Sequence, residues 1–339
     1  MRLIDCTYLN SPGGKKILKI FLDKMPSNEL KKFNFIIDFR ADITTLNKLK
    51  NTQYKLIKNS ELNRRAYYNS IKNKIEKCIC LANVPPPIKL ECDVVIYFHN
   101  DLLLNPRLSL SFSRSLSFFI KKNYIKIVNS KEYKWIVQTD LMKKKLSNYL
   151  LIKSENINVI PIFTNFTIKL NSIKTPNSFL YVCSSSPHKN LKRLIQAFNQ
   201  IKNVNSKSLC LDLTIPDKSF FQKEILQKNK NNNLVIKNNI NLNESSIKKL
   251  YSKSEYLIYP SVVESFGLPL IESIEFKCKI LASNLPYVKE IIKPSVTFDP
   301  FSVSSIADSI DYVIDKNNIV DSEMLIQNKI DKFIELIKS

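Results

Sequence analysis

Glycine is scarce in this sequence of 339 residues, which contains three. An average composition of about 7% would give roughly 24, so we expect glycine here only where a side chain is not tolerated. Two of the three stand together at Gly13 and Gly14. The third, Gly267, lies between Glu264 and Glu272 in the segment VESFGLPLIES, although the chain has a formal net charge of +22. We expect both places to face the same ligand.

Long apolar runs and paired cysteines are also missing. No run approaches the roughly 18 apolar residues that cross a bilayer, and Asp5 stands where a signal peptide needs an apolar core, so we expect no membrane insertion. The seven cysteines include no C-x-x-C pair, and two histidines accompany them. This pattern argues against a zinc site and is typical of reduced core residues in a cytoplasmic protein.

Acidic residues are few, at 30 against 52 Lys and Arg. Residues 1–165 hold 29 basic and 13 acidic side chains, a formal charge of +16 out of the total of +22. Such asymmetry fits a nucleic acid, an anionic membrane surface or a phosphorylated substrate, and equally a solvated Lys-rich surface. Because no RRM, KH or zinc-finger signature accompanies the charge, a nucleic-acid partner is the less favoured interpretation.

Short apolar runs alternate with Lys-rich helical segments along the whole chain. In the first half these runs are residues 2–9, 33–39, 55–58, 93–98 and 134–139. In the second half they are residues 178–184, 209–216, 233–237, 256–261 and 278–283. The rhythm is typical of buried parallel strands with crossover helices, and the length exceeds one core. The sequence therefore predicts an α/β protein with two doubly wound halves.

The polar segment 161–178, with a proline at 161 and another at 176, is the expected linker between the halves. We therefore predict an N-terminal domain at residues 1–165 and a C-terminal domain at 166–322. The last segment, 323–339, carries an apolar stripe at helical spacing that must pack on another element, and the N-terminal domain is one candidate. The stretch 105–123 mixes apolar and basic residues and fits either an ordinary strand or a segment that dips into lipid headgroups.

The segment around Gly267 predicts a strand that ends at Ser261 and a helix that begins near Leu268. Ligands of open α/β sheets bind beyond the carboxyl ends of strands, where the start of a helix favours phosphate. A glycine there lets the backbone approach an anion closely. Ionised Glu264 and Glu272 accept hydrogen bonds from hydroxyls, so a diphosphate flanked by a sugar and a ribose, a nucleotide sugar, would satisfy both. The alternative is that the helix dipole favours Glu264 and that Glu272 is solvated.

Three segments, residues 259–291, 179–198 and 296–310, resemble retaining glycosyltransferases of family four, which have the GT-B fold. The resemblance implies two Rossmann-like domains that face each other across a cleft. It implies that Glu264 and Glu272 bind the nucleotide-sugar donor and that Lys189 contacts its diphosphate. It extends the donor site to the residues that follow Glu264, namely Ser265, Phe266, Gly267 and Leu268.

The sequence departs from the family pattern at two places. Cys183 and Ser184 stand where many members have Gly-Arg, so Lys189 acts alone on the diphosphate or with weaker contacts from residues such as Ser184 and His188. The glycine before the nucleobase loop is also missing, and base recognition is expected through the backbone of Ile240. A lysine opposed to a helix dipole is explained when an anion lies between them, although Lys189 also fits an ordinary surface position.

The N-terminal segment LIDCTYLNSPGGKKILKIFL predicts a strand, a glycine turn and a helix. It resembles the N-terminal loop of the same family, which implies that Gly13 and Gly14 border the transferred sugar and the phosphate; an ordinary turn is the alternative. His99 follows a strand. A histidine at such a place is often structural, but the resemblance implies a contact with the donor sugar that is not general-base catalysis.

The acceptor side is expected near Asn100, Gln138 and Thr139, each of which follows a predicted strand. The lysines at 143–145 fit an approach to an anionic membrane or a lipid diphosphate, and fit a solvated face equally well.

The function implied is retaining, metal-independent sugar transfer from a nucleotide sugar to a glycan acceptor in bacterial surface polysaccharide synthesis. His99, Lys189 and Glu264 are expected to carry it, without a cofactor. No D-x-D motif for a cation is present. The acceptor would be lipid-linked, for instance to undecaprenyl diphosphate, at the inner face of the cell membrane. The alternative is a catalytically inactive module of the same fold that binds nucleotide or glycan.

Overall fold

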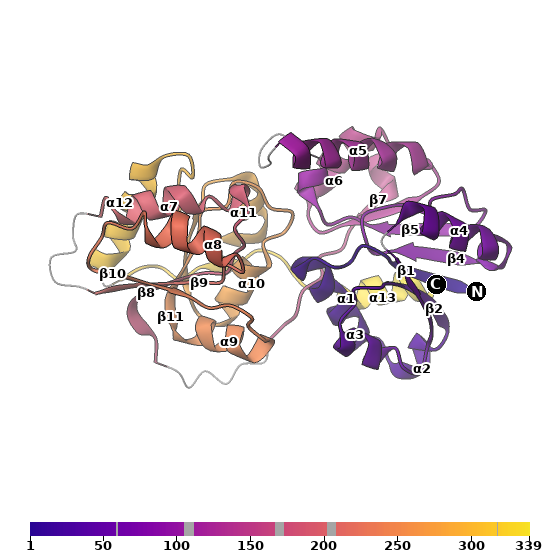
Figure 1. Ribbon diagram of the computed structural model, residues 1–339, viewed down its shortest axis with the longest axis horizontal. Coiled ribbons are helices and arrows are strands. Elements are labelled where there is room, and N and C mark those ends of the chain that lie inside the picture. The colour runs from indigo at the N-terminus through magenta and orange to yellow at the C-terminus, as the bar shows by residue number, and fades with distance from the viewer. Residues whose placement is uncertain (59, 105–111, 167–172, 202–207, 317) are drawn as a thin grey trace. The chain divides into compact units, whose positions relative to one another are not determined.

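The computed structural model of the protein contains two compact units (Figure 1). It describes residues 1–58, 60–104, 112–166, 173–201, 208–316 and 318–339. Among these, unit 1 consists of residues 1–104, 113–164 and 327–339, and unit 2 of residues 165–326. Each unit has its own parallel sheet, so the predicted pair of doubly wound α/β halves is confirmed.

Unit 1 is built on a seven-stranded parallel sheet with the order β3-β2-β1-β4-β5-β6-β7. Its strands are β1 (Arg2–Cys6), β2 (Phe33–Asp38), β3 (Gln53–Ile57), β4 (Lys77–Cys80), β5 (Asp93–Tyr97), β6 (Lys134–Val137) and β7 (Ile157–Val159). Sequence reasoning found five of them and missed β4 and β7. The missed strands have four and three residues, too few for a run of apolar residues to stand out against the neighbouring helices.

Helices cover both faces of this sheet. On one face α1 (Pro12–Lys24) and α13 (Ile330–Lys338) contribute to one hydrophobic core. On the other, α4 (Glu61–Ile71), α5 (Phe112–Val128) and α6 (Asp140–Leu150) contribute to a second core. Shorter helices are α2 (Ser27–Leu30) and α3 (Ile43–Lys48), with 3-10 turns at η1 (Lys72–Lys74), η2 (Asp101–Leu103) and η4 (Ser154–Asn156).

The C-terminal helix completes the core of unit 1. Figure 1 shows α13, in yellow, beside α1, in indigo. The ring of Phe333 meets Phe21 edge-on at 6.1 Å and Tyr97 at 5.5 Å between centroids. Lys77 Nζ donates a hydrogen bond of 2.7 Å to the carbonyl oxygen of Leu336. The predicted helix from residue 323 is too long, because residues 323–324 form a strand and the helix begins at Ile330.

Unit 2 is built on a six-stranded parallel sheet with the order β10-β9-β8-β11-β12-β14. Its strands are β8 (Thr175–Tyr181), β9 (Leu209–Leu213), β10 (Leu234–Asn238), β11 (Ser254–Tyr259), β12 (Lys279–Ser283) and β14 (Val296–Phe298). Its helices are η5 (Pro187–Lys189), α7 (Leu191–Phe198), α8 (Lys218–Phe220), the π-helical η6 (Phe221–Leu226), α9 (Glu244–Lys253), α10 (Leu268–Glu275), α11 (Pro286–Ile291) and α12 (Val303–Asp315). A small antiparallel pair, β13 (Ile292–Lys293) with β15 (Glu323–Met324), completes it.

The expected linker is shorter than its sequence suggests. Ile162 and Phe163 are buried in unit 1, and the segment from Thr175 onward already belongs to β8. Residues 167–172 lie outside the described part of the chain. The polypeptide returns to unit 1 after residue 326, whereas the predicted C-terminal domain ends at residue 322.

The stretch 105–123 is helical from Phe112 onward, so the strand interpretation is wrong for its described part. Its first residues, 105–111, lie outside the described part of the chain. On the outer side of α5, Phe119 and Ile120 are 57% and 60% exposed, whereas Ile125 is fully buried. Within the described residues, no helix combines the length and the apolar character needed to cross a bilayer.

Both sheets have the same switch in strand order. In unit 1 the chain starts at β1, moves outward through β2 and β3, and then crosses to β4 on the other side of β1. Unit 2 repeats this with β8, then β9 and β10, then β11. In such sheets the crevice for a ligand lies beyond the carboxyl ends of the two strands where the order reverses. The loops after β1 and β4, and after β8 and β11, are therefore the places where function is expected.

Candidate functional site

Lys189 and Glu264 meet at the switch point of unit 2. Lys189 ends η5, which follows β8, and Glu264 lies in the loop after β11. Lys189 Nζ lies 2.5 Å from Glu264 Oε1, and the two side chains are 15% and 14% exposed. The lysine ammonium also lies 5.9 Å from the centre of the Tyr259 ring. Two residues that sequence reasoning gave separate ligand contacts are thus joined in one ion pair.

Hydrogen bonds between the two loops fix this geometry. The backbone N–H of Val262 donates to the carbonyl oxygen of His188 at 2.9 Å. The Tyr181 hydroxyl, at the end of β8, donates to the carbonyl oxygen of Lys189 at 2.9 Å and lies 2.7 Å from Ser261 Oγ. Asn190, in the left-handed conformation with φ 59°, donates to carbonyl oxygens after β11 and β14. These hydrogen bonds fix the positions of Lys189 and Glu264 before a ligand binds.

The charges of the site favour an ionised carboxylate and a neutral imidazole. Burial alone would raise the pKa of Glu264, but Lys189, His188 and Ser261 together outweigh it and lower that pKa below its ordinary value. Burial lowers the pKa of His188 to about 4; Glu264 opposes this shift and Lys189 adds to it. At neutral pH the free protein thus has one cation and one anion here, and they neutralise each other.

Gly267 begins α10 as its N-cap, so the predicted helix start near Leu268 is confirmed. Its φ is +74°, in the left-handed region that side chains other than glycine rarely adopt. A Cβ at this position would also lie 3.1 Å from Leu270 Cδ1. The backbone conformation itself therefore requires glycine, whatever ligand approaches the helix.

Glu272 is buried, with 6% of its surface exposed, so the alternative of a solvated helix residue is wrong. Its Oε2 accepts a hydrogen bond of 2.9 Å from the hydroxyl of Tyr251 on α9. A buried carboxylate held by a tyrosine hydroxyl is oriented by the fold. Whether it also accepts bonds from a ribose remains the prediction that the resemblance supplies.

The remaining predicted residues of unit 2 follow the carboxyl ends of β8, β10 and β11, on one edge of the sheet. Ser184 donates from Oγ to Ser186 Oγ at 3.1 Å. Phe266 is 4% exposed and packs into the core, which leaves its backbone as the part available to a ligand. Ser265, Leu268 and Ile240 are each partly exposed.

In unit 1, Gly13 and Gly14 belong to the first turn of α1, so the predicted glycine turn is wrong. The helix starts at Pro12, whose fixed φ suits the first helical position, and Ser11 Oγ caps it by accepting from the Gly14 N–H at 3.2 Å. A Cβ on Gly14 would approach Leu9 Cδ2 to 3.0 Å, whereas a Cβ on Gly13 would meet nothing within 4 Å. Packing thus explains the glycine at position 14, whereas no contact within the described part of unit 1 requires a glycine at position 13.

His99 lies just beyond β5, on the same carboxyl edge as α1's first turn. Its backbone N–H donates to Asn83 Oδ1 at 2.6 Å, and its Nε2 lies 3.2 Å from the carbonyl oxygen of Leu81. The same Nε2 lies 3.3 Å from Asn83 Nδ2, which only donates, whereas the carbonyl only accepts, so the tautomer of the ring decides which of the two contacts is a hydrogen bond. Burial lowers the pKa of His99 to about 4, so the ring is neutral near pH 7.

Two of the three residues expected on the acceptor side are helix caps, and the third is buried. Thr139 caps α6 by accepting from the Met142 N–H at 3.2 Å, and Asn100 caps η2 in the same way. Gln138 is 3% exposed. Lys145, one of the three lysines expected at a membrane or solvated face, instead pairs with buried Asp101 at 2.5 Å.

Sequence reasoning missed Asn83, which holds His99 from the loop after β4. Asn83 is 8% exposed and has φ 68°, a conformation that asparagine tolerates better than most residues. Because residues 77–80 were not predicted to form a strand, no functional residue was expected in the loop that follows them. The three prolines that follow at 85–87 are the one local signal of a turn there.

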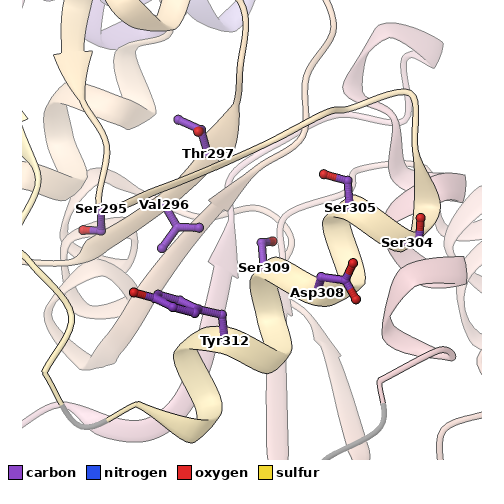
Figure 2. Close-up of a pocket in the computed structure, with 8 residues that line it drawn as sticks. All are labelled: Ser295, Val296, Thr297, Ser304, Ser305, Asp308, Ser309 and Tyr312. Atoms are coloured by element: carbon purple, nitrogen blue, oxygen red, sulfur yellow. The ribbon is translucent and has the colours of Figure 1, made fainter.

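A pocket of about 470 Å³ lies away from these strand tips, between β14 and α12 of unit 2 (Figure 2). Its lining is hydroxyl-rich, with one carboxylate, and consists of Ser295, Val296, Thr297, Ser304, Ser305, Asp308, Ser309 and Tyr312. None of these is a cation that would hold a phosphate. The paired residues at the switch point are therefore the stronger candidate site.

Comparison with known proteins identifies the family of the chain. Residues 163–332, half of the chain, match the family model of glycosyl transferases group 1. The O-antigen chain mannosyltransferase RfbU of Salmonella typhimurium is 28% identical over 181 residues. That alignment covers 51% of this chain and 50% of RfbU, so the chain spans about half the length of the curated relative it matches.

Solved structures share the fold at low sequence identity. Anabaena HepE, in complex with UDP and glucose, has a TM-score of 0.66 at 13% identity, over 93% of this chain and 90% of that one. WaaG, a glycosyltransferase involved in lipopolysaccharide biosynthesis, has a TM-score of 0.63 at 14% identity with the same coverage. These similarities, with the two parallel sheets, assign the GT-B fold. The family match over half of the chain shows that this protein belongs to the glycosyl transferases group 1 family.

Proposed function

We propose that the protein transfers a sugar from a nucleotide-sugar donor to a glycan acceptor with retention of the anomeric configuration and without a metal ion. One observation carries this proposal: a partly buried cation and a partly buried anion, Lys189 and Glu264, lie together at the switch point of a doubly wound sheet. A phosphate needs the cation and a polyhydroxylated sugar needs an acceptor of hydrogen bonds. A nucleotide sugar contains both groups.

In this proposal each residue of unit 2 has one role. The Lys189 ammonium leaves Glu264 and compensates the negative charge of the diphosphate, which grows as the diphosphate departs. Glu264 then accepts hydrogen bonds from sugar hydroxyls. The amino end of α10, which starts at Leu268, adds its dipole. Buried Glu272 accepts from the ribose, and the backbone at Ile240 contacts the base.

Unit 1 supplies the sugar side of the reaction. Gly13 leaves open space at the start of α1, as a close approach of donor atoms requires. His99, neutral and held by Asn83, donates or accepts one hydrogen bond with the sugar and does not act as a general base. No protein nucleophile is assigned, and the departing phosphate takes the proton of the acceptor hydroxyl.

The acceptor that we propose is a lipid-linked glycan in the synthesis of a bacterial surface polysaccharide, such as one carried on undecaprenyl diphosphate. The similarity to RfbU supports this proposal, because RfbU is named as an O-antigen chain mannosyltransferase. The protein would work in the cytoplasm at the inner face of the membrane. The outer side of α5 supports this, since Phe119, Ile120 and Ile127 are exposed there beside Lys121 and Lys126.

A panel of nucleotide sugars, measured by thermal shift, tests the proposal first. We expect one donor class to raise the melting temperature, and the same donor to be consumed when a lipid-linked glycan extract is added. Glu264→Gln should abolish consumption with the fold intact. Stabilisation by no nucleotide sugar would contradict the proposal, and binding without transfer to any acceptor would favour an inactive binding module. EDTA should leave turnover unchanged.

The membrane contact has its own test. Sedimentation with vesicles of phosphatidylglycerol should retain the wild-type chain more strongly than a Phe119→Ser/Ile120→Ser variant, because two exposed apolar side chains are removed from a basic helix face. Phosphatidylcholine vesicles are the control. Equal retention of both proteins would exclude this face as the contact.

A further inference from the structure

His188 is a buried side chain of the site that the proposed function leaves without a role. The residue is 8% exposed, and its fully buried Nδ1 has no hydrogen-bond partner among the described residues. An unpaired buried polar atom costs free energy, and such atoms in native proteins call for an explanation. The carbonyl oxygen of His188 accepts a hydrogen bond from the Val262 N–H, which fixes the backbone at this position.

The free site has no surplus positive charge. Lys189 is neutralised by Glu264 at 2.5 Å, and Ser184, on the loop after β8, carries no charge. A nucleotide-sugar diphosphate brings two negative charges to a place with one cation that already has an anion beside it. A second cation is needed to balance the charge, because desolvated charges without a partner are costly.

His188 is the titratable group placed to supply that charge. Glu264, from the loop after β11, and Lys189, its neighbour in η5, are the charged groups that face it. The surrounding hydroxyls and thiol stay neutral, because burial raises the pKa of Tyr181, Tyr259 and Tyr287 well above the ordinary value and that of Cys183 to about 12.

We propose that His188 takes up a proton from solvent when the diphosphate of the donor binds, and that the resulting imidazolium supplies a second positive charge beside that diphosphate. This rests on the proposed function. In the free protein, burial and Lys189 lower the pKa of His188 to about 4, so the ring is neutral. When the diphosphate draws Lys189 away from Glu264 and adds negative charge, the same ring gains two attractive neighbours and its pKa rises.

Isothermal titration with UDP-glucose and GDP-mannose tests the proton uptake. The bridging diphosphate of these donors carries no proton that titrates near neutral pH, so the ligand itself contributes nothing. Near pH 6, titration in two buffers of different ionisation enthalpy should give an uptake approaching one proton with whichever donor binds. His188→Asn should remove the uptake and weaken binding by roughly 10- to 100-fold, the value of a charged hydrogen bond. His99→Asn, at the sugar contact proposed above, is expected to weaken binding, but the number of protons taken up per donor bound should stay the same.

Each result of the titration leads to one conclusion about His188 and the proposed function. Binding of a donor without proton uptake by the wild-type protein overturns the role of His188 and leaves the proposed function intact. Absence of binding by any donor defeats the proposed function as well. Should His188→Asn fold poorly, NMR of the imidazole Cε1–H signals of the wild-type chain decides instead. With two histidines to assign, the His188 signal must move from the neutral to the protonated position on donor binding, and a signal that stays neutral in the complex refutes the proposal.

Discussion

The ion pair between Lys189 and Glu264 makes a prediction about stability that needs no substrate. At 2.5 Å and an effective dielectric constant of about 20, the attraction between the two charges is on the order of 7 kcal/mol. Desolvation of both groups offsets part of this. Lys189→Met leaves the carboxylate with 14% of its side chain exposed and no cation beside it. We expect the free energy of unfolding to fall by about 3 kcal/mol, at the low end for a broken buried pair because the carboxylate can take up a proton.

The assay is a double-mutant cycle by urea unfolding near pH 7, with Lys189→Met, Glu264→Gln and the double variant. The double variant removes both charges together, so it should recover most of the loss, with a coupling energy of about 2 kcal/mol. In thermal melts the single variant should lose roughly 6–12 °C, the shift that about 3 kcal/mol gives in a unit of this size.

The matched control is the exposed pair between Lys293 and Glu323 of the same unit, where the side chains are 66% and 59% exposed. Lys293→Met should change stability by less than about 1 kcal/mol. A Lys189→Met protein as stable as the wild type, with no coupling in the cycle, would refute the reasoning, because the two charges could not then be paired in the free protein.

Four further predictions follow from the same geometry. Gly267→Ala should lower the free energy of unfolding by about 1–2 kcal/mol in urea melts, because its φ of +74° strains any other residue. Gly13→Ala should leave the free energy of unfolding unchanged or raise it by up to about 1 kcal/mol, because position 13 is helical and has room for a Cβ. The same variant should reduce turnover, because the added methyl group would occupy the space that the donor needs. Arg64→Met should lower the free energy of unfolding by about 3–5 kcal/mol, because Arg64 Nε donates to the buried carboxylate of Asp5 at 2.8 Å and the variant leaves that carboxylate without its cation. An unchanged melting curve would show that this ion pair does not stabilise the fold. Wild-type stability should fall by about 4 kcal/mol between pH 7 and pH 5, about 2 kcal/mol through each of His188 and His99, because the pKa of each ring is about 4 when folded and near 6.5 when unfolded, so that the unfolded chain binds the protons first. His188→Asn should halve that slope.

Most of the fold could be predicted because buried parallel strands leave continuous apolar runs. The segment YLIYPS predicted strand β11 and where it ends, and therefore that Glu264 lies in the loop after it. Strands β4 and β7 were lost because a run of three or four residues carries too little signal. The length of α13 was overestimated, since Met324 and Leu325 continue its apolar stripe in sequence, whereas Met324 pairs with Ile292 in a strand and the Leu325 N–H donates to the carbonyl oxygen of Ile291.

The site could be predicted only in part, because sequence shows which residues follow strands but not which of them touch. Lys189 and Glu264 were each placed at a strand tip, yet their direct pairing depends on β8 lying next to β11. Asn83 could not be found without β4. The glycine turn at Gly13 and Gly14 was wrong because Pro12, with the Ser11 cap, starts the helix earlier than two adjacent glycines suggest.

The donor site itself is tested most directly by titrating the Lys189→Met/Glu264→Gln variant with the nucleotide sugar that stabilises the wild-type chain. Since both charges are removed together, this variant should melt close to the wild type and still show no measurable heat of donor binding. Donor affinity equal to that of the wild type, in a variant equally stable, would show that the nucleotide sugar binds elsewhere.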